Sequence, residues 1–153
     1  MKMLTEKQNL SFKIMISLGI INQLTDSWLG KALAPLGLNQ SQFNLLNHFS
    51  HQPEREQTIS QLAQVMQMNQ PGITKVVNKL FDMGLVDIRK DEQDGRKKWV
   101  RINEKGLAKV QSAFSSFLPM MKECFDDWTE DDMSQMLSHS NKLKVWLDNN
   151  RDI

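Results

Sequence analysis

The chain contains few of the residues that cross-link a protein, break its helices or anchor it in a membrane. Among its 153 residues there are one cysteine, four prolines, seven glycines and no tyrosine. A single cysteine excludes an internal disulfide framework and a thiolate metal cluster. No uninterrupted apolar stretch reaches the length of a transmembrane helix, and the apolar N-terminal run lacks the cleavage site of a secretory signal. We therefore expect a folded cytoplasmic protein of one domain, with no cofactor and no membrane partner.

Charge is distributed unevenly along the chain. The formal net charge is only +1, but residues 58–101 carry eight Lys and Arg against five Asp and Glu, which leaves +3 in this segment and −2 elsewhere. A protein that is basic in the middle and mildly acidic elsewhere can present one face to a polyanion. The acidic run near residue 130 needs no ligand, because Thr129 can cap a helix whose first-turn acids complement the helix dipole.

Apolar residues at helical spacing predict three helices in the first half of the chain. The first helix has apolar residues at steps of three and four over Leu10–Ala32, with a second apolar edge, and it ends at Pro35. A helix that is apolar on two sides needs two surfaces to pack against. The second helix begins at Asn39 or Ser41, and a short third helix begins at Thr58, whose hydroxyl can accept a bond from a first-turn amide.

A fourth helix, a β-hairpin and two long helices follow. Asn69 is the predicted cap of the fourth helix, and Gly84 closes it in the left-handed conformation. The segments LVDIRK and KKWVRI are predicted strands joined by the turn DEQDG. An apolar seam over Leu107–Cys124, which Pro119 should kink, and a helix capped by Thr129 complete the chain. The order indicates a mainly α chain of the α+β class, with a helix-turn-helix followed by a two-stranded wing.

The fourth helix has an aliphatic back and a polar front. The predicted back consists of Ile73, Val76, Val77 and Leu80, whereas the opposite face offers glutamine, threonine, asparagine and lysine. Asparagine and glutamine can pair with the edge of adenine, lysine with guanine, and threonine with a thymine methyl, so this face suits the DNA major groove. An ordinary surface helix is also polar on its exposed side, and the helix alone does not decide between the two interpretations.

The hairpin turn favours DNA. Asp94 and Arg96 are two residues apart, so the carboxylate can hold the guanidinium in an extended position through a charge-assisted bond, bidentate in its best geometry. An arginine held in this way can enter a minor groove, where narrow A·T tracts concentrate negative potential. Lys97 and Lys98 are then available for flanking phosphates.

These segments resemble the MarR family of bacterial transcriptional regulators. The wing pattern of that family appears here as DGRKKWV followed by NEKG, and its recognition-helix pattern appears as TKVVNKLFDMGL. The resemblance implies a winged helix-turn-helix over residues 38–103 and dimerisation helices over residues 1–36 and 104–153. It also implies a homodimer that binds a pseudo-palindromic operator in double-stranded DNA, most simply as a repressor.

The pattern and the resemblance together give a set of expected DNA-binding residues on the third and fourth helices and on the wing. They are Thr58, Gln61, Asn69, Gln70, Pro71, Gly72, Thr74, Lys75, Asn78, Lys79, Arg89, Asp94, Arg96, Lys97 and Lys98. Family members often respond to small aromatic or anionic effectors, and Met15 and Trp28 could line a crevice for one. A role for both residues in the core is the simpler interpretation.

Other chemistry finds little support in the sequence. Cys124 lies on the apolar seam with no activating group nearby, so we expect a buried structural thiol. His48 and His51 are three residues apart and His139 is remote, which disfavours a metal site. No phosphate-binding glycine loop or nucleophile elbow is present, so we expect no enzyme. The main alternative is a winged-helix module that binds protein and does not read DNA.

Overall fold

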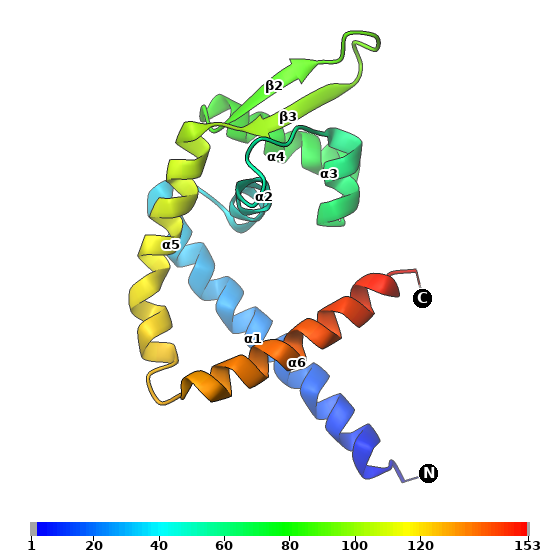
Figure 1. Cartoon of the computed structure of the whole chain (residues 1–153), viewed down its shortest axis with the longest axis vertical. Coiled ribbons are helices and arrows are strands. Elements are labelled where there is room, and N and C mark those ends of the chain that lie inside the picture. The colour runs from blue at the N-terminus through cyan, green and yellow to red at the C-terminus, as the bar shows by residue number, and fades with distance from the viewer. Residues whose placement is uncertain (1–2, 153) are drawn as a thin grey trace. The chain divides into compact units, whose positions relative to one another are not determined.

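The computed structural model describes residues 3–152 and confirms a mainly α-helical chain with a small antiparallel sheet (Figure 1). The elements are α1 (Glu6–Leu33), the 3-10 helix η1 (Ala34–Leu36), α2 (Gln40–Ser50), β1 (Gln57–Thr58), α3 (Ile59–Met66), α4 (Gln70–Asp82), β2 (Val86–Lys90), β3 (Lys98–Ile102), α5 (Glu104–Cys124) and α6 (Glu130–Asn149). They form two compact units, of which the first ends at Phe117 and the second begins at Leu118. None of the described helices combines the length and the apolar character needed to cross a membrane.

The predicted helix starts are confirmed in both units. Asn39, Thr58, Asn69 and Thr129 each accept a hydrogen bond from a first-turn backbone amide of α2, α3, α4 and α6 respectively. These bonds satisfy amides that a helix leaves without partners at its first turn. Gly84 follows α4 with a φ of +75°, so it terminates the helix in the left-handed conformation, as expected.

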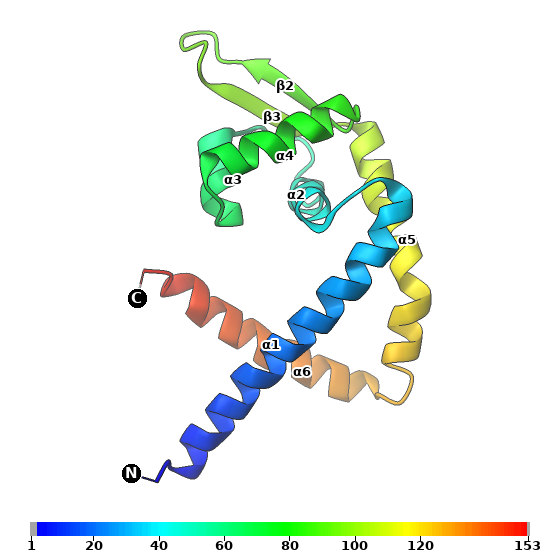
Figure 2. The same ribbon diagram turned by 180° about the vertical axis from the view of Figure 1, so that it is seen from behind.

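The sheet has one strand more than the sequence predicted. Its order is β1-β3-β2, and both pairings are antiparallel. The short strand β1 pairs Thr58 with Trp99, so the cap of α3 also belongs to the sheet. Val100 and Ile102 face the core, while Trp99 and the residue opposite it, Arg89, lie on the other face. The β2–β3 hairpin projects away from α3 and α4 as a wing (Figures 1 and 2).

A single apolar core holds the first unit together. Leu45, Leu62, Ile73 and Leu80 are fully buried and bring α2, α3 and α4 under the sheet. The core continues with aromatic residues, which are joined by edge-to-face contacts. The ring centroids of Trp28 and Phe117 and those of Phe43 and Phe117 are 5.4 Å apart in each pair. The shared core under the sheet fixes the orientation of α4 and of the wing relative to each other.

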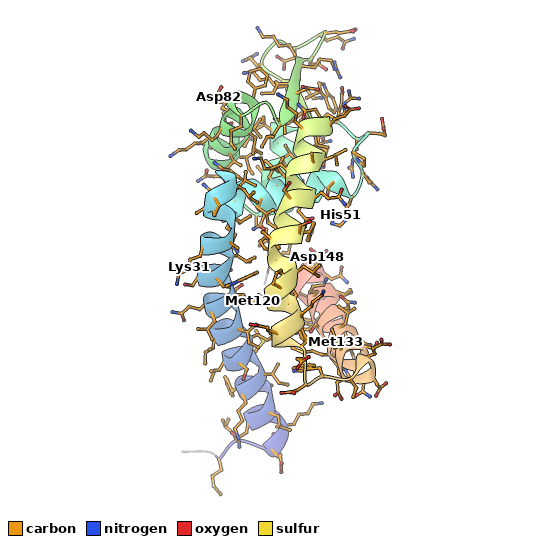
Figure 3. The ribbon with its side chains drawn as sticks, turned by 90° about the vertical axis from the view of Figure 1, so that its left-hand side faces the viewer. Lys31, His51, Asp82, Met120, Met133 and Asp148 are labelled. Carbon is orange, nitrogen blue, oxygen red and sulfur yellow. The ribbon has the colours of Figure 1, made fainter. Side chains whose placement is uncertain are left out.

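Helices α1 and α6 leave most of their apolar side chains exposed. Only Leu33 is buried on α1, where Ile16 is 61% exposed. No described residue of α6 is buried, and Leu137 and Trp146 are 61% and 56% exposed. Figure 3 draws the side chains of both helices and labels Lys31 on α1 and Met133 on α6. Rows of exposed large apolar side chains are typical of surfaces that another molecule covers.

The prediction of a buried Cys124 is wrong. Its side chain is exposed at the last residue of α5, which continues through Pro119 as one helix. The apolar seam on which it lies is also exposed at Phe114 and Met121. An apolar stripe indicates burial against some partner, but it does not identify that partner.

Candidate nucleic-acid interface

Helix α4 presents its polar face because its apolar face is anchored in the core. Ile73, Val77 and Leu80 recur at helical spacing and are at most 1% exposed. The opposite side of the helix is therefore free to carry exposed side chains, among them Thr74 and Lys75. In Figure 2, α4 lies alongside α3 and next to the β2–β3 hairpin. The helix can thus approach a partner without a change in its packing.

The first turn of α4 has a tight local structure. The Asn69 side-chain oxygen accepts a hydrogen bond of 2.7 Å from the amide of Gly72. A Cβ at Gly72 would lie 2.9 Å from that oxygen, so glycine leaves room for the cap. Asn69 and Gly72 therefore shape the start of the helix, while Gln70 and Pro71 are exposed there.

An open groove runs beside α4 and is bounded on its other side by the first turn of α2. The lining residues are Asn39, Ser41, Gln42, Met68, Gln70, Pro71, Gly72, Thr74, Lys75, Val76, Asn78, Lys79 and Asp82. Seven of the DNA-binding residues predicted on the fourth helix share this surface. Figure 3 labels Asp82, which lies at the C-terminal end of α4.

Asp94 binds the backbone of Arg96 more closely than the guanidinium that it was predicted to hold. Its Oδ1 accepts a hydrogen bond of 3.0 Å from the backbone amide of Arg96, whereas the Arg96 Nε lies 3.7 Å away. At 3.7 Å the guanidinium and the carboxylate form an ion pair but no hydrogen bond. The Arg96 side chain is 98% exposed. Asp94 therefore shapes the turn that carries Arg96 and pairs with a guanidinium that stays almost wholly exposed.

The sequence reasoning missed Asp91, which organises the base of the same turn. Its Oδ2 accepts bonds of 3.2 and 3.1 Å from the amides of Gln93 and Asp94, and its Oδ1 accepts a bond of 3.0 Å from the indole of Trp99. The bond from Trp99 is the largest cause of a lowered Asp91 pKa, followed by the bond from the Asp94 amide. A lowered pKa means that the ionised carboxylate stabilises the folded loop at neutral pH, and that this contribution is lost in acid as Asp91 becomes protonated.

The cations of the wing differ in their partners. Arg89 donates to Glu56 at 2.6 Å, and this bond is the largest cause of a lowered Glu56 pKa and of a raised Arg89 pKa. The guanidinium carbon of Arg89 and the Nζ of Lys97 lie 5.7 and 4.9 Å from the centre of the Trp99 ring. Lys97 and Lys98 are exposed. Arg89 thus reaches a carboxylate first, while Arg96 and the two lysines face solvent.

Thr58 and Gln61 have a clear structural role at the start of α3. The Thr58 hydroxyl accepts a bond of 3.2 Å from the Gln61 amide, and the Gln61 side-chain oxygen accepts one of 3.0 Å from the Thr58 amide. Thr58 is buried, whereas Gln61 is exposed. This reciprocal capping places both residues at the positive end of α3.

The two candidate effector residues are not brought together within one chain. Met15 is exposed on α1, whereas Trp28 is half-buried against Phe117. Thirteen residues of helix separate their Cα atoms by roughly 20 Å. Among the residues that the structure describes, no three His, Cys, Asp or Glu side chains are grouped closely enough to hold a metal ion.

Comparison with known proteins agrees with this geometry. A sequence model of the MarR family matches residues 36–97. The uncharacterized HTH-type transcriptional regulator YdcH of Bacillus subtilis (strain 168) is 34% identical over 96 residues, which cover 60% of this chain and 65% of the length of that relative. The family is one of transcriptional regulators and not of enzymes, in agreement with the expectation from the sequence.

Two solved structures extend the similarity over most of the chain. The transcriptional regulator BldR of Sulfolobus solfataricus has a TM-score of 0.77 at 25% identity, over 92% of this chain and 99% of that chain. A mutant of MarR from E. coli, crystallised with operator DNA, has a TM-score of 0.71 at 19% identity, over 91% of this chain and 99% of that chain. The order of the elements and the winged sheet agree with the match of residues 36–97 to the MarR family.

Proposed function

We propose that this protein is a transcriptional regulator that binds double-stranded DNA in a sequence-specific manner. The observation that carries the proposal is that α4 and the wing, in the same compact unit, expose a polar helix face and an Arg96 side chain that is 98% exposed. The helix face suits the major groove, and the extended guanidinium suits the adjacent minor groove. The crystallisation of a structurally similar MarR mutant with operator DNA supports the proposal that this chain binds DNA.

The active form is proposed to be a homodimer. Helices α1 and α6 each expose a row of large apolar side chains, which a second copy of the chain would cover. Residues 1–36 and 104–153 then form the dimerisation region, and residues 38–103 form the DNA-binding lobe. A two-fold dimer matches a pseudo-palindrome whose half-sites lie about one helical turn apart.

Regulation follows from the position of such a dimer on DNA. A cytoplasmic dimer bound over a promoter excludes polymerase, so we propose a repressor. Met15 is half-exposed on α1 and Trp28 is half-buried farther along the same helix. A small aromatic or anionic effector bound near these residues, where two copies would meet, is the proposed signal that releases the DNA.

Selection of genomic fragments by the purified protein tests this function. We expect enrichment of fragments that contain a two-fold repeat. Analytical ultracentrifugation should show that the protein bound to this repeat has twice the mass of the chain. Affinity for that repeat should fall on the order of a hundredfold or more from low to moderate salt, because several phosphate contacts release counterions. Absent or salt-insensitive binding across the fragment pool would instead identify a module that binds protein.

The ion pair between Glu56 and Arg89 predicts a substitution that strengthens binding to DNA. Replacing Glu56 with glutamine removes the negative charge that Arg89 contacts at 2.6 Å. We expect the variant to bind the selected duplex roughly threefold more tightly at about 0.1 M salt, with a steeper salt dependence, because Arg89 becomes available to a phosphate. Fluorescence anisotropy over a salt series measures both quantities.

Glu54→Gln is the matched control for this experiment. Glu54 is exposed two residues away, and no ion pair of its side chain occurs in the described part of the chain. Its replacement should change affinity by less than half as much. Equal gains from both variants would show that the ion pair does not restrain Arg89.

A further inference from the structure

Trp99 occupies a special position in the wing. It lies in the central strand β3, directly opposite Thr58 on β1 and Arg89 on β2. The ring is half-buried on the outer face of the sheet, close to Arg89 and Lys97. A tryptophan in such a place has a rigid apolar body fixed by the sheet and one hydrogen-bond donor that can reach beyond it.

The donor of Trp99 starts a chain of hydrogen bonds that leads to the tip of the wing. The indole donates to Asp91 Oδ1 at 3.0 Å, and Asp91 Oδ2 accepts the amide of Asp94 at 3.1 Å. Asp94 Oδ1 in turn accepts the amide of Arg96 at 3.0 Å. Two backbone bonds across the turn close the loop, from the Asp91 amide to the Lys97 carbonyl at 2.9 Å and from the Lys97 amide to the Asp94 carbonyl at 3.0 Å.

We propose that Trp99 is a positioning residue that fixes Arg96 for entry into the DNA through Asp91 and Asp94. The inference rests on the proposed function and deepens it. The Arg96 side chain itself is almost wholly exposed, so its guanidinium has no packing to hold it. The backbone of the turn is what sets its direction, and the Asp91 side chain that accepts the amides of this turn is itself held by the indole N–H of Trp99.

The ring also organises cations beside this turn. Lys97 Nζ lies 4.9 Å from the ring centre, within the range of a cation–π contact. Asp91 and Lys97 therefore both depend on Trp99, one through the N–H and the other through the ring face. Replacement of Trp99 with phenylalanine removes the donor and keeps an aromatic face, so it separates the two effects.

The test compares Trp99→Phe, Arg96→Ala and the double variant in the full-length protein. We expect Trp99→Phe to weaken binding to the selected duplex roughly three- to tenfold, because the free turn must be ordered on binding. The salt dependence should not change, because no charge is removed. The double variant should bind no more weakly than Arg96→Ala alone, because Trp99 acts through Arg96.

Amide hydrogen exchange supplies a readout that does not need DNA. The amides of Asp94 and Arg96 should exchange faster in Trp99→Phe, while the midpoint of thermal unfolding stays within about two degrees of the wild type. Asp91→Ala should also speed the exchange of these two amides and leave the unfolding midpoint within the same range. Combining Asp91→Ala with Trp99→Phe should produce no further increase in exchange. This second variant keeps the ring of Trp99 in place and covers the case in which the aromatic replacement disturbs the sheet.

Trp28→Phe is the control for the loss of an indole N–H, because Trp28 packs on Phe117 and lies far from the wing along the chain. It should change neither the exchange of the tip amides nor the salt dependence. Unchanged exchange at Asp94 and Arg96 in Trp99→Phe, or additive losses in the double variant, would overturn the proposal. If the wild type binds no duplex, the proposed function fails, and the exchange result still decides whether Trp99 orders the tip.

Discussion

Replacing Arg96 with alanine is expected to weaken binding to the two-fold duplex by about a hundredfold at moderate salt. A dimer carries two copies of this arginine, and each specific arginine contact in a groove contributes roughly 1–3 kcal/mol. The side chain is 98% exposed in the free protein, so its loss should leave the fold intact. Anisotropy titrations with an operator duplex measure the loss, and circular dichroism checks that the variant is folded.

Arg55→Ala is the matched control, because Arg55 is also exposed and the substitution removes the same charge outside the wing. It should cost less than a tenth of the loss seen with Arg96→Ala. The slope of affinity against salt should fall by roughly two for Arg96→Ala, one unit for each protomer. Equal losses in the two variants would mean that binding depends on overall charge and not on the wing.

The second large effect is expected from Gly106→Ala, which should lower the free energy of unfolding by about 3 kcal/mol. Gly106 is buried in the first turn of α5, where an added Cβ would overlap the Leu85 carbonyl oxygen and lie 2.6 Å from Ile102 Cγ1. The backbone oxygen cannot move freely, because it also accepts the Asn103 amide at 3.3 Å. In calorimetry the unfolding midpoint should fall by roughly 6–12 °C.

The same substitution at Gly30 should have the opposite sign. Gly30 lies inside α1, and apart from its own stretch of helix nothing in the described chain comes within 4 Å of the Cβ that alanine would add there. Alanine in a helix interior is favoured over glycine by roughly 0.5–1 kcal/mol, so a slight rise of the unfolding midpoint is expected. A Gly106→Ala protein as stable as the wild type would show that α5 can shift away from the base of the wing.

The local features of the fold could be predicted from the sequence because each depends on neighbouring residues. The cap residues Thr58 and Asn69, the left-handed Gly84 and the buried stripe of α4 all follow from short-range rules, and the structure confirms them. The polar face of α4 and the wing residue Arg96 could be placed for the same reason. Their use in binding DNA stays a prediction.

The features that the sequence did not reveal join residues far apart in the chain. The bond between Glu56 and Arg89 spans 33 residues, and the two-residue strand β1 forms only because β3 lies beside it. From the sequence, Asp91 could not be distinguished from the other charged residues of the turn, because no local pattern shows that the indole of Trp99 donates a hydrogen bond to it. The exposure of Cys124 was misjudged because an apolar helix face does not say which molecule covers it.

The order of the sheet has a consequence for the behaviour of the protein at high concentration. Strand β2 is an open edge, and open edges pair readily with strands of other molecules and lead to aggregation. Its exposed residues Asp87, Arg89 and Lys90 are all charged, and the opposite edge is formed by only two residues of β1. The charges on β2 and the short length of β1 therefore disfavour pairing of either sheet edge with a strand of another molecule. The wing can project from the protein without promoting the formation of intermolecular fibres.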